Sequence, residues 1–224
     1  MKRAFDIIIS IFVLIGTSPL FLLAIVGIKL SSKGAVFYRA MRVGQGGTPF
    51  AMYKFRSMHV STGGSVITAA NDTRVFGFGA FLRKSKIDEL PQFLNVLRGD
   101  MSIIGPRPED PKIVTDHYTD WMIKTLDVRP GISSPGAIYY YGYGEHLIDD
   151  ADPEGSYVQN LLPPKLAVEL AYLQRANFWS DLGVAIQTAL AIFKVIAGRP
   201  IRLPQRDLDG ALNWVSAAQL QASR

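Results

Sequence analysis

The pattern of apolar and polar positions opens with one long uncharged stretch. Ile7 to Ile28 carries no charged residue over 22 positions, and 16 of these positions are apolar. As a straight helix the stretch would be about 33 Å long, which is enough to span a bilayer. The cluster Gly16-Thr17-Ser18-Pro19 interrupts it near the middle. The pattern therefore predicts a membrane-embedded helical segment with a break halfway along.

The break and the flanking charges favour a hairpin that enters and leaves the same leaflet. Pro19 has no N–H, so the carbonyl of Ile15 loses its helical partner, and the hydroxyls of Thr17 and Ser18 can satisfy the freed groups. Lys and Arg collect on the cytoplasmic side of membrane segments. They flank both ends here, at Lys2, Arg3, Lys29, Lys33, Arg39 and Arg42. A cleaved signal sequence and a kinked single-pass anchor are the alternatives.

The first half of the remaining chain predicts a hairpin followed by short helices. Aromatic and β-branched residues over 36–43 and 49–56, separated by three glycines, are typical of a β-hairpin. Residues 60–73 are rich in Ser, Thr, Gly and Asn and predict a mobile loop, and 75–84 predict a helix. The next helix has an apolar face and a stop at Gly99. The positions of that face are Leu90, Phe93, Leu94 and Leu97.

The second half predicts three longer helices and one loop. Helices are expected over 109–127, 163–178 and 180–197, and a loop rich in Gly, Pro and Tyr over 130–147. The helix over 180–197 is nearly apolar but contains Gln187 and Lys194, which favours a buried or interfacial position over a spanning one. The tail begins with a Pro-interrupted stretch, and a short helix is expected near its end. The apolar residues of that helix are Leu212, Trp214, Val215 and Leu220.

Composition and charge exclude several classes of site. The chain of 224 residues has no cysteine, so disulfides, zinc fingers and thiol nucleophiles are excluded. The three histidines are scattered. Residues 29–112 hold 13 Lys and Arg against 6 Asp and Glu, whereas 113–224 hold 9 against 12. A basic half beside a membrane segment favours anionic head groups or phosphorylated substrates, with a collar that only sets topology as the alternative.

The pair Asp88-Glu89 is the sharpest candidate for chemistry. It lies at or just before the N-terminus of the helix that follows, where the helix dipole stabilises an ionised carboxylate. An ionised Asp can attack phosphorus or hold Mg²⁺. An ordinary helix cap is the alternative, because Asp and Glu are common in a first turn.

Cations around the pair favour an anion site with a hard metal. Arg107 stands between two prolines, which present its guanidinium on a stiff backbone suited to phosphate. Lys54 and Arg56 alternate with aromatic residues on a strand and therefore share one face. Arg83, Lys84 and Lys86 lie just upstream of the carboxylates.

Three blocks of sequence resemble the bacterial sugar transferase family, the monotopic phosphoglycosyl transferases of polysaccharide and glycoconjugate assembly. The blocks are Phe50–Met58 (FAMYKFRSM), Arg83–Leu94 (RKSKIDELPQFL) and Asn95–Pro108 (NVLRGDMSIIGPRP). The resemblance is strong over 1–108 and weaker over 109–197. It implies transfer of a sugar 1-phosphate from a nucleotide-diphosphate sugar, usually UDP-linked, to polyprenyl (undecaprenyl) phosphate with release of UMP. It makes Asp88 the nucleophile of a covalent phosphosugar intermediate and Glu89 its assistant.

The resemblance also implies the remaining site and partners. Mg²⁺ or Mn²⁺ would lie near Asp88, and substrate phosphate would bind Lys54, Arg56, Arg83 and Arg107. The expected fold is α/β, mostly α with a small β-hairpin. It comprises a re-entrant helix broken at Ser18 and Pro19 with its basic flank over 1–33, a cytoplasmic catalytic domain with interfacial helices over 34–198, and a tail over 199–224. Membrane lipids and downstream glycosyltransferases are the implied partners, with homodimer formation open, at the cytoplasmic face of the bacterial inner membrane.

Two departures and two rival functions stay open. Ser133-Ser134-Pro135 stands where a Gly-rich continuation is expected, and residues 134–164 are unusually rich in Tyr and acids. This region is expected to touch sugar or nucleotide, so the identity of the donor stays undecided. A membrane scaffold that has lost activity is the alternative function, although the intact Asp88-Glu89 pair argues against it. Nucleic-acid binding is not expected, because no recognised motif accompanies the basic half.

Overall fold

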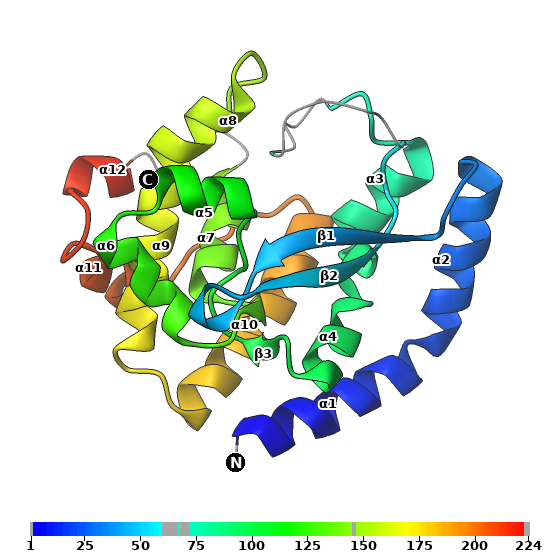
Figure 1. Cartoon of the computed structure of the whole chain (residues 1–224), viewed down its shortest axis with the longest axis horizontal. Coiled ribbons are helices and arrows are strands. Elements are labelled where there is room, and N and C mark those ends of the chain that lie inside the picture. The colour runs from blue at the N-terminus through cyan, green and yellow to red at the C-terminus, as the bar shows by residue number, and fades with distance from the viewer. Residues whose placement is uncertain (1, 60–66, 68–71, 145–146, 222–224) are drawn as a thin grey trace.

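The structure is a computed structural model that describes residues 2–59, 67, 72–144 and 147–221 (Figure 1). It is mostly helical with two small sheets; the helical content and the hairpin sheet are as the sequence predicts, and the second sheet is not. The α-helices are α1 Lys2–Gly16, α2 Ser18–Ser31, α3 Gly77–Lys84, α4 Gln92–Arg98, α5 Pro111–His117, α6 Asp120–Ile123, α7 Pro135–Tyr143, α8 Pro153–Ser156, α9 Leu162–Leu173, α10 Phe178–Ile196, α11 Gln205–Ala211 and α12 Ala217–Gln221. The strands are β1 Phe37–Val43, β2 Pro49–Phe55, β3 Ser102–Ile104 and β4 Gly131–Ser133. Most of the loop expected over 60–73 lies outside the described residues.

The long apolar stretch is broken where the sequence predicts. Helices α1 and α2 meet at Thr17 with a bend of 59° (Figure 1). The hydroxyl of Ser18 donates to the carbonyl of Ile15 at 2.8 Å, and that of Thr17 donates to the carbonyl of Val13 at 2.7 Å. The predicted compensation for the missing N–H of Pro19 is thus confirmed.

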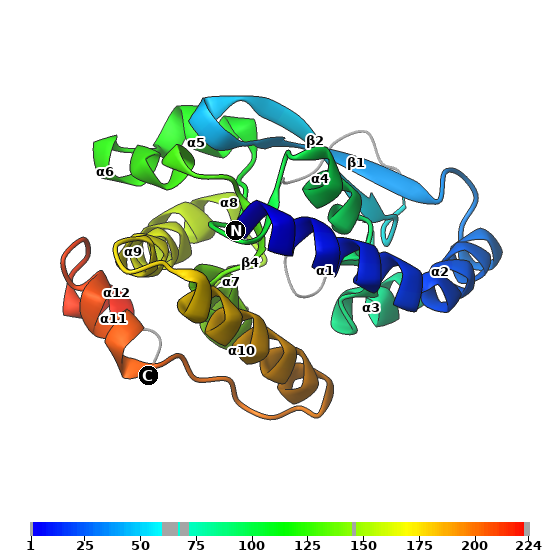
Figure 2. The ribbon, with the colours of Figure 1, turned by 90° about the horizontal axis from the view of Figure 1, so that it is seen from below.

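The first turns of α1 are tied to the rest of the chain. The carboxylate of Asp6 accepts hydrogen bonds from the hydroxyl of Ser102 and the backbone N–H of Ile103. Lys2 donates to the carbonyl of Ile104 at 3.0 Å and forms an ion pair with Asp181. These contacts fix the start of α1 against β3 and the start of α10. Figure 2, seen from below, shows the N-terminus beside the start of α10.

The end of α2 is tied to the same body of the protein. Ala24 and Ile28 are fully buried and pack with Phe55 of β2 and Leu82 of α3 in a small hydrophobic cluster. Ser32 then accepts from Arg56, the residue that follows strand β2 of the hairpin. Both ends of the α1–α2 pair therefore contact the strand and helix framework.

The predicted β-hairpin is confirmed. Strands β1 and β2 pair antiparallel from Phe37 opposite Phe55 to Val43 opposite Pro49. The connecting turn contains Gly46 and Gly47 at φ values of 65° and 78°, a conformation that glycine adopts without strain.

A second sheet and a helix replace most of the loop expected over 130–147. Strands β3 and β4 pair in parallel, with Ser102 opposite Gly131. A Cβ on Gly131 would lie 2.3 Å from the carbonyl oxygen of Gly105, so this crossing requires glycine. Helix α7 follows because the hydroxyl of Ser134 accepts from the N–H of Ala137 and Pro135 occupies the first turn. The loop prediction was wrong because it rested on the high content of Gly, Pro and Tyr, although Ser134-Pro135 is a helix start signal.

Two other helices differ from expectation. The region 109–127 divides into α5, α6 and a final 3₁₀ turn, Lys124–Asp127, because the backbone of Tyr118 and Thr119 is extended. Helix α4 begins at Gln92 rather than Leu90, and its buried residues are Gln92, Asn95 and Val96. The predicted apolar face is only partly covered, and Leu94 is 40% exposed.

Helix α9 runs through the main core, and ten of its twelve residues are buried. The tail folds back on it as α11 and α12, with Ala211 and Val215 buried and Trp214 stacked on Trp121 of α6. The tail is therefore part of the folded body.

Only three of the nineteen residues of helix α10 are buried. Phe193 is 71% exposed and Trp179 is 75% exposed, which excludes the buried position that the sequence left open. By length and composition α10 could cross a membrane. The α1–α2 pair is long and apolar enough to do so only if its two bent halves are counted as one span.

Candidate active site

Asp88 and Glu89 lie in a 3₁₀ turn, Ile87–Glu89, that precedes α4. Both side chains are buried, at 5% and 9% exposure. Because α4 starts only at Gln92 and is short, the helix dipole has less influence on the pair than the sequence suggested. Nearby cations take over that role.

Glu89 is held by two of the predicted cations. The Arg107 guanidinium donates in bidentate fashion, with Nη1 3.0 Å from Oε2 and Nη2 2.5 Å from Oε1. Lys54 of β2 lies 3.4 Å from Oε1. Burial alone would raise the pKa of Glu89, but Arg107, Lys54 and Lys86 together hold it far below its usual value. Glu89 is therefore an ionised carboxylate whose oxygens are occupied.

Asp88 has the opposite environment. Its Oδ1 is buried and has no hydrogen-bond partner among the described residues. Burial raises the pKa of Asp88, and the charge of Glu89 adds to this, while Lys54 and Lys86 oppose it. A carboxylate with a free, desolvated oxygen and a raised pKa is more nucleophilic than one whose oxygens are paired.

The other two predicted cations are placed differently. Arg56 is 4% exposed and donates to the carbonyl and hydroxyl of Ser32 and to the carbonyl of Ala35. Its guanidinium thus joins the end of α2 to the hairpin. Strand β2 ends at Phe55, so Arg56 lies beyond the strand on which it was expected to share a face with Lys54. Arg83 contacts the Met58 sulfur and lies close enough to lower the pKa of Asp88.

Lys86 and Tyr141 join the site without having been singled out as site residues. Lys86 has φ 59°, the single positive φ among the described non-glycine residues, directly before the carboxylate turn. Its ammonium lies 3.9 Å from the ring centroid of Tyr141 on α7, a cation–π contact. Desolvation lowers the pKa of Lys86, while Glu89 and Asp88 raise it. The Ser134-Pro135 helix start was the signal that could have placed Tyr141.

Asp88 and Glu89 offer too few free oxygens to bind a hard cation alone, and phosphate oxygens of a bound substrate would have to supply further ligands. No group of three His, Cys, Asp or Glu side chains in the described part of the chain could hold a metal ion. The free Oδ1 of Asp88 is one oxygen ligand, and Mg²⁺ usually takes one or two carboxylates with phosphate oxygens and water. His59 and His117 form no such cluster, and His146 lies outside the described residues.

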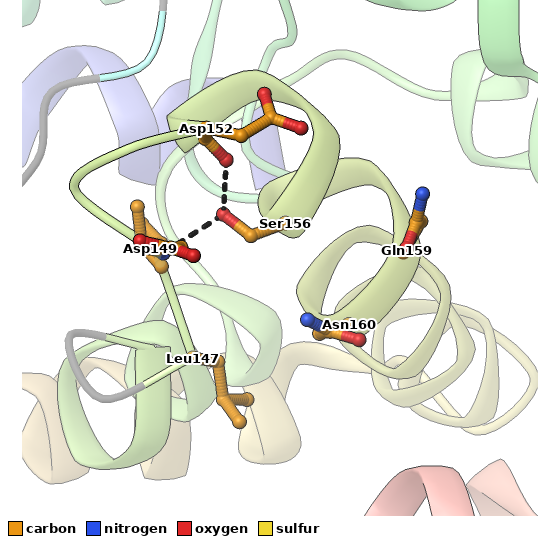
Figure 3. A pocket seen from close by; sticks show the side chains of 7 residues that line it. Leu147, Asp149, Asp152, Ser156, Gln159 and Asn160 are labelled. Atoms are coloured by element: carbon orange, nitrogen blue, oxygen red, sulfur yellow. Dashed lines mark hydrogen bonds between the residues drawn. The ribbon is translucent and has the colours of Figure 1, made fainter.

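The larger hollows lie on other elements. One, of about 480 Å³, is lined by Leu147, Ile148, Asp149, Asp152, Ser156, Gln159 and Asn160. Figure 3 shows Ser156 between two of these residues, accepting from the N–H of Asp149 and donating to the carbonyl of Asp152. It belongs to the region expected to touch sugar or nucleotide. Another, of about 610 Å³, lies where α1 and α10 begin and includes Tyr172 and Phe178.

Comparisons with known proteins agree over most of the chain. A sequence model of the family described as "Bacterial sugar transferase" matches residues 1–195. A UDP-glucose:undecaprenyl-phosphate glucose-1-phosphate transferase of Escherichia coli (strain K12) is 48% identical over 202 residues, 87% of this chain and 40% of that protein. One of the same name from Xanthomonas campestris pv. campestris is 39% identical over 197 residues, 85% and 38% respectively.

A third relative differs in its sugar. The UDP-N-acetylgalactosamine-undecaprenyl-phosphate N-acetylgalactosaminephosphotransferase of Aeromonas hydrophila is 36% identical over 203 residues, 89% of this chain and 45% of that protein. The chain therefore spans less than half the length of these three relatives, and their names differ in the sugar transferred.

Proposed function

The chain belongs to the bacterial sugar transferase family, and from this premise we propose that it transfers a sugar 1-phosphate from a UDP-sugar to undecaprenyl phosphate. The observation that supports the proposal most directly is the unequal carboxylate pair. Glu89 is neutralised by Arg107 and Lys54, whereas Asp88 keeps one oxygen free in a buried, cation-rich setting. Phosphoryl transfer requires this combination of nucleophile and charge neutralisation more than acid–base power.

The proposed reaction has two displacement steps. An oxygen of Asp88 attacks the sugar-linked phosphorus, the bond to the UMP oxygen breaks, and UMP leaves with that electron pair. A phosphate oxygen of undecaprenyl phosphate then attacks the same phosphorus and displaces Asp88, giving undecaprenyl-diphosphate sugar. Mg²⁺ or Mn²⁺, when bound at Asp88, would neutralise phosphate charge. Lys54, Lys86 and Arg83 would stabilise the negative charge of the transferred group, while Arg107 keeps Glu89 in place.

The bent helix pair supports a position at one membrane face. A spanning segment separates its ends by a bilayer, yet Lys2 contacts Asp181 and Ser32 contacts Arg56, so both ends lie on the same framework. Between them Phe12 and Ile15 are 69% and 68% exposed, and Leu22 of α2 is 66% exposed. We infer a re-entrant hairpin in the cytoplasmic leaflet of the bacterial inner membrane, which would place Asp88 where a soluble UDP-sugar and a lipid phosphate meet.

Release of UMP tests the proposal. Membranes containing the protein, supplied with UDP-glucose or UDP-N-acetylgalactosamine, undecaprenyl phosphate and Mg²⁺, should release UMP, and Asp88→Asn should abolish the release. Mass spectrometry of protein quenched before the lipid is added should detect a phosphosugar on Asp88, and its mass distinguishes a hexose from an N-acetylhexosamine. Full activity of Asp88→Asn would disprove the nucleophile assignment. Absence of release with every UDP-sugar would favour the inactive scaffold.

A further inference from the structure

Two charged side chains lie inside the most buried helix of the protein. Lys165 and Glu169 of α9 are 3% and 0% exposed and stand four positions apart, so they share one face of the helix. Buried charges are costly unless they are paired or hydrogen-bonded. Their hydrogen-bond and ion-pair partners therefore show which segments of the chain this face of α9 fixes in place.

Glu169 joins two segments that are distant in sequence. Its Oε1 accepts from the hydroxyl of Ser134 at 2.5 Å and from the backbone N–H of Arg107 at 3.3 Å. A Cβ on Gly136 would lie 2.5 Å from the same oxygen, so the first turn of α7 packs directly on the carboxylate. Burial raises the pKa of Glu169 to about 7, while Ser134 and Lys165 oppose the rise.

Lys165 holds the same loop one turn away on α9. Its ammonium forms a buried ion pair with Glu109, which also accepts from the hydroxyl of Tyr157 at 2.6 Å. The loop Pro106–Glu109 is thus fixed to α9 at two positions, through the backbone of Arg107 and the side chain of Glu109. Two such contacts set both the position and the orientation of a short loop.

Both segments joined by Glu169 carry a group onto the carboxylate pair. The Pro106–Glu109 loop carries Arg107, whose guanidinium binds Glu89. Helix α7 carries Tyr141, whose ring packs on Lys86 two residues before Asp88. A shift of either segment would change the charge around Asp88 without touching Asp88 itself.

We propose that Glu169 is a positioning residue that holds Arg107 and Tyr141 in register with Asp88 and Glu89. Its contribution to catalysis rests on the proposed function. The link between the Pro106–Glu109 loop and α7 through Glu169 does not, since it follows from the contacts alone.

Steady-state kinetics test the catalytic part. In folded Glu169→Ala, kcat for UMP release should fall by about 10–100-fold with little change in the KM for the UDP-sugar. Glu169→Gln keeps an acceptor for the N–H of Arg107 and should restore most of kcat. In an Arg107→Ala background, Glu169→Ala should cost less than it does alone, because one of the two groups that it positions is already absent. Full kcat in folded Glu169→Ala, or additive losses in the double variant, would overturn the catalytic role.

Hydrogen exchange followed by mass spectrometry tests the link without any substrate. In Glu169→Ala, exchange should rise together over 105–110 and 134–143, with α1 unchanged. Ser134→Ala removes one contact of Glu169 and also the cap of α7, so a rise over 105–110, which the lost cap does not explain, supports the link if Glu169→Ala does not fold. Glu154→Ala removes a partly exposed carboxylate paired with Lys112 and should change neither segment. If UMP is never released by the unchanged protein, the proposed function fails and exchange alone decides: a joint rise supports the link, and a rise confined to α9 overturns it.

Discussion

Arg107 closes a bidentate ion pair on Glu89, with both guanidinium nitrogens within 3.0 Å of the two carboxylate oxygens. The same arginine donates its backbone N–H to Glu169. One residue therefore connects the carboxylate turn before α4 with the central helix α9. Because Glu89 is occupied in this way, the neighbouring Asp88 is left as the free carboxylate of the pair.

Arg107→Lys should retain the charge and lose the bidentate geometry. We expect kcat/KM for UMP release to fall by about 10–100-fold, because Glu89 is no longer fixed and its charge is poorly placed for Asp88. Arg98→Lys is the matched control, since Arg98 is exposed and its partners, Asp100 and the hydroxyl of Tyr53, are not part of the carboxylate pair. Equal activity of the two variants would contradict the role given to Arg107.

Asp88→Asn should inactivate the enzyme and raise its thermal stability at pH 7. The pKa of Asp88 is raised in the folded state, so the stability it contributes is present at low pH and is lost as pH rises through that pKa. Asn mimics the neutral acid, so we expect Tm to rise by a few degrees at pH 7 and the gain to shrink on acidification. A lower Tm of Asp88→Asn at pH 7, measured by calorimetry, would show that the buried Asp88 carboxylate does not destabilise the folded protein.

Glu89→Gln should have the opposite effect on stability. The pKa of Glu89 is lowered in the folded state, so its contribution is present above the ordinary carboxyl pKa and is lost as pH falls. The variant leaves the buried Arg107 without its carboxylate partner and should lower Tm at pH 7, with a cost of about 1–3 kcal/mol. Urea unfolding should show a constant difference between pH 7 and pH 5 and a shrinking one from pH 5 down to pH 2, and a difference that stays constant down to pH 2 would contradict it.

Lys86→Gly should separate backbone strain from charge. Glycine adopts φ 59° without strain, so the fold should be as stable as before or more so. The ammonium next to Tyr141 and the carboxylates is lost, and we expect kcat/KM to fall by about tenfold or more. Lys84→Gly, an exposed neighbour at the end of α3, is the control for unspecific loss of a cation. Unchanged kcat/KM in Lys86→Gly would remove Lys86 from the site.

Pro19→Ala should weaken the bend between α1 and α2. The alanine N–H can bond the carbonyl of Ile15, which in the present structure accepts from the hydroxyl of Ser18. Because the chain has no cysteine, a single Lys33→Cys reports the side on which α2 ends. We expect it to be labelled only from the cytoplasmic side in the parent and partly from the outer side with Pro19→Ala. Outer labelling in the parent would show a spanning helix.

The sequence predicted the local features correctly where one short segment carries the whole signal. Pro19 removes a donor, Ser18 and Thr17 supply replacements, and two glycines permit the hairpin turn, wherever the rest of the chain lies. The placement of Arg56 shows the limit of such reasoning. Alternation along a strand put it beside Lys54, whereas its partners are Ser32 and Ala35, more than twenty positions earlier in the chain.

The sequence by itself determined the family, the break in the uncharged segment and the choice of Asp88-Glu89 as the candidate pair, because each is written in contiguous residues. The tertiary structure decided which cations serve that pair and which of the two carboxylates stays free. Lys54, Lys86, Arg107 and Tyr141 come from separate elements, and Glu169 of α9 contacts both the Pro106–Glu109 loop and the start of α7. Long-range packing of this kind depends on contacts between distant segments, and no local pattern encodes it.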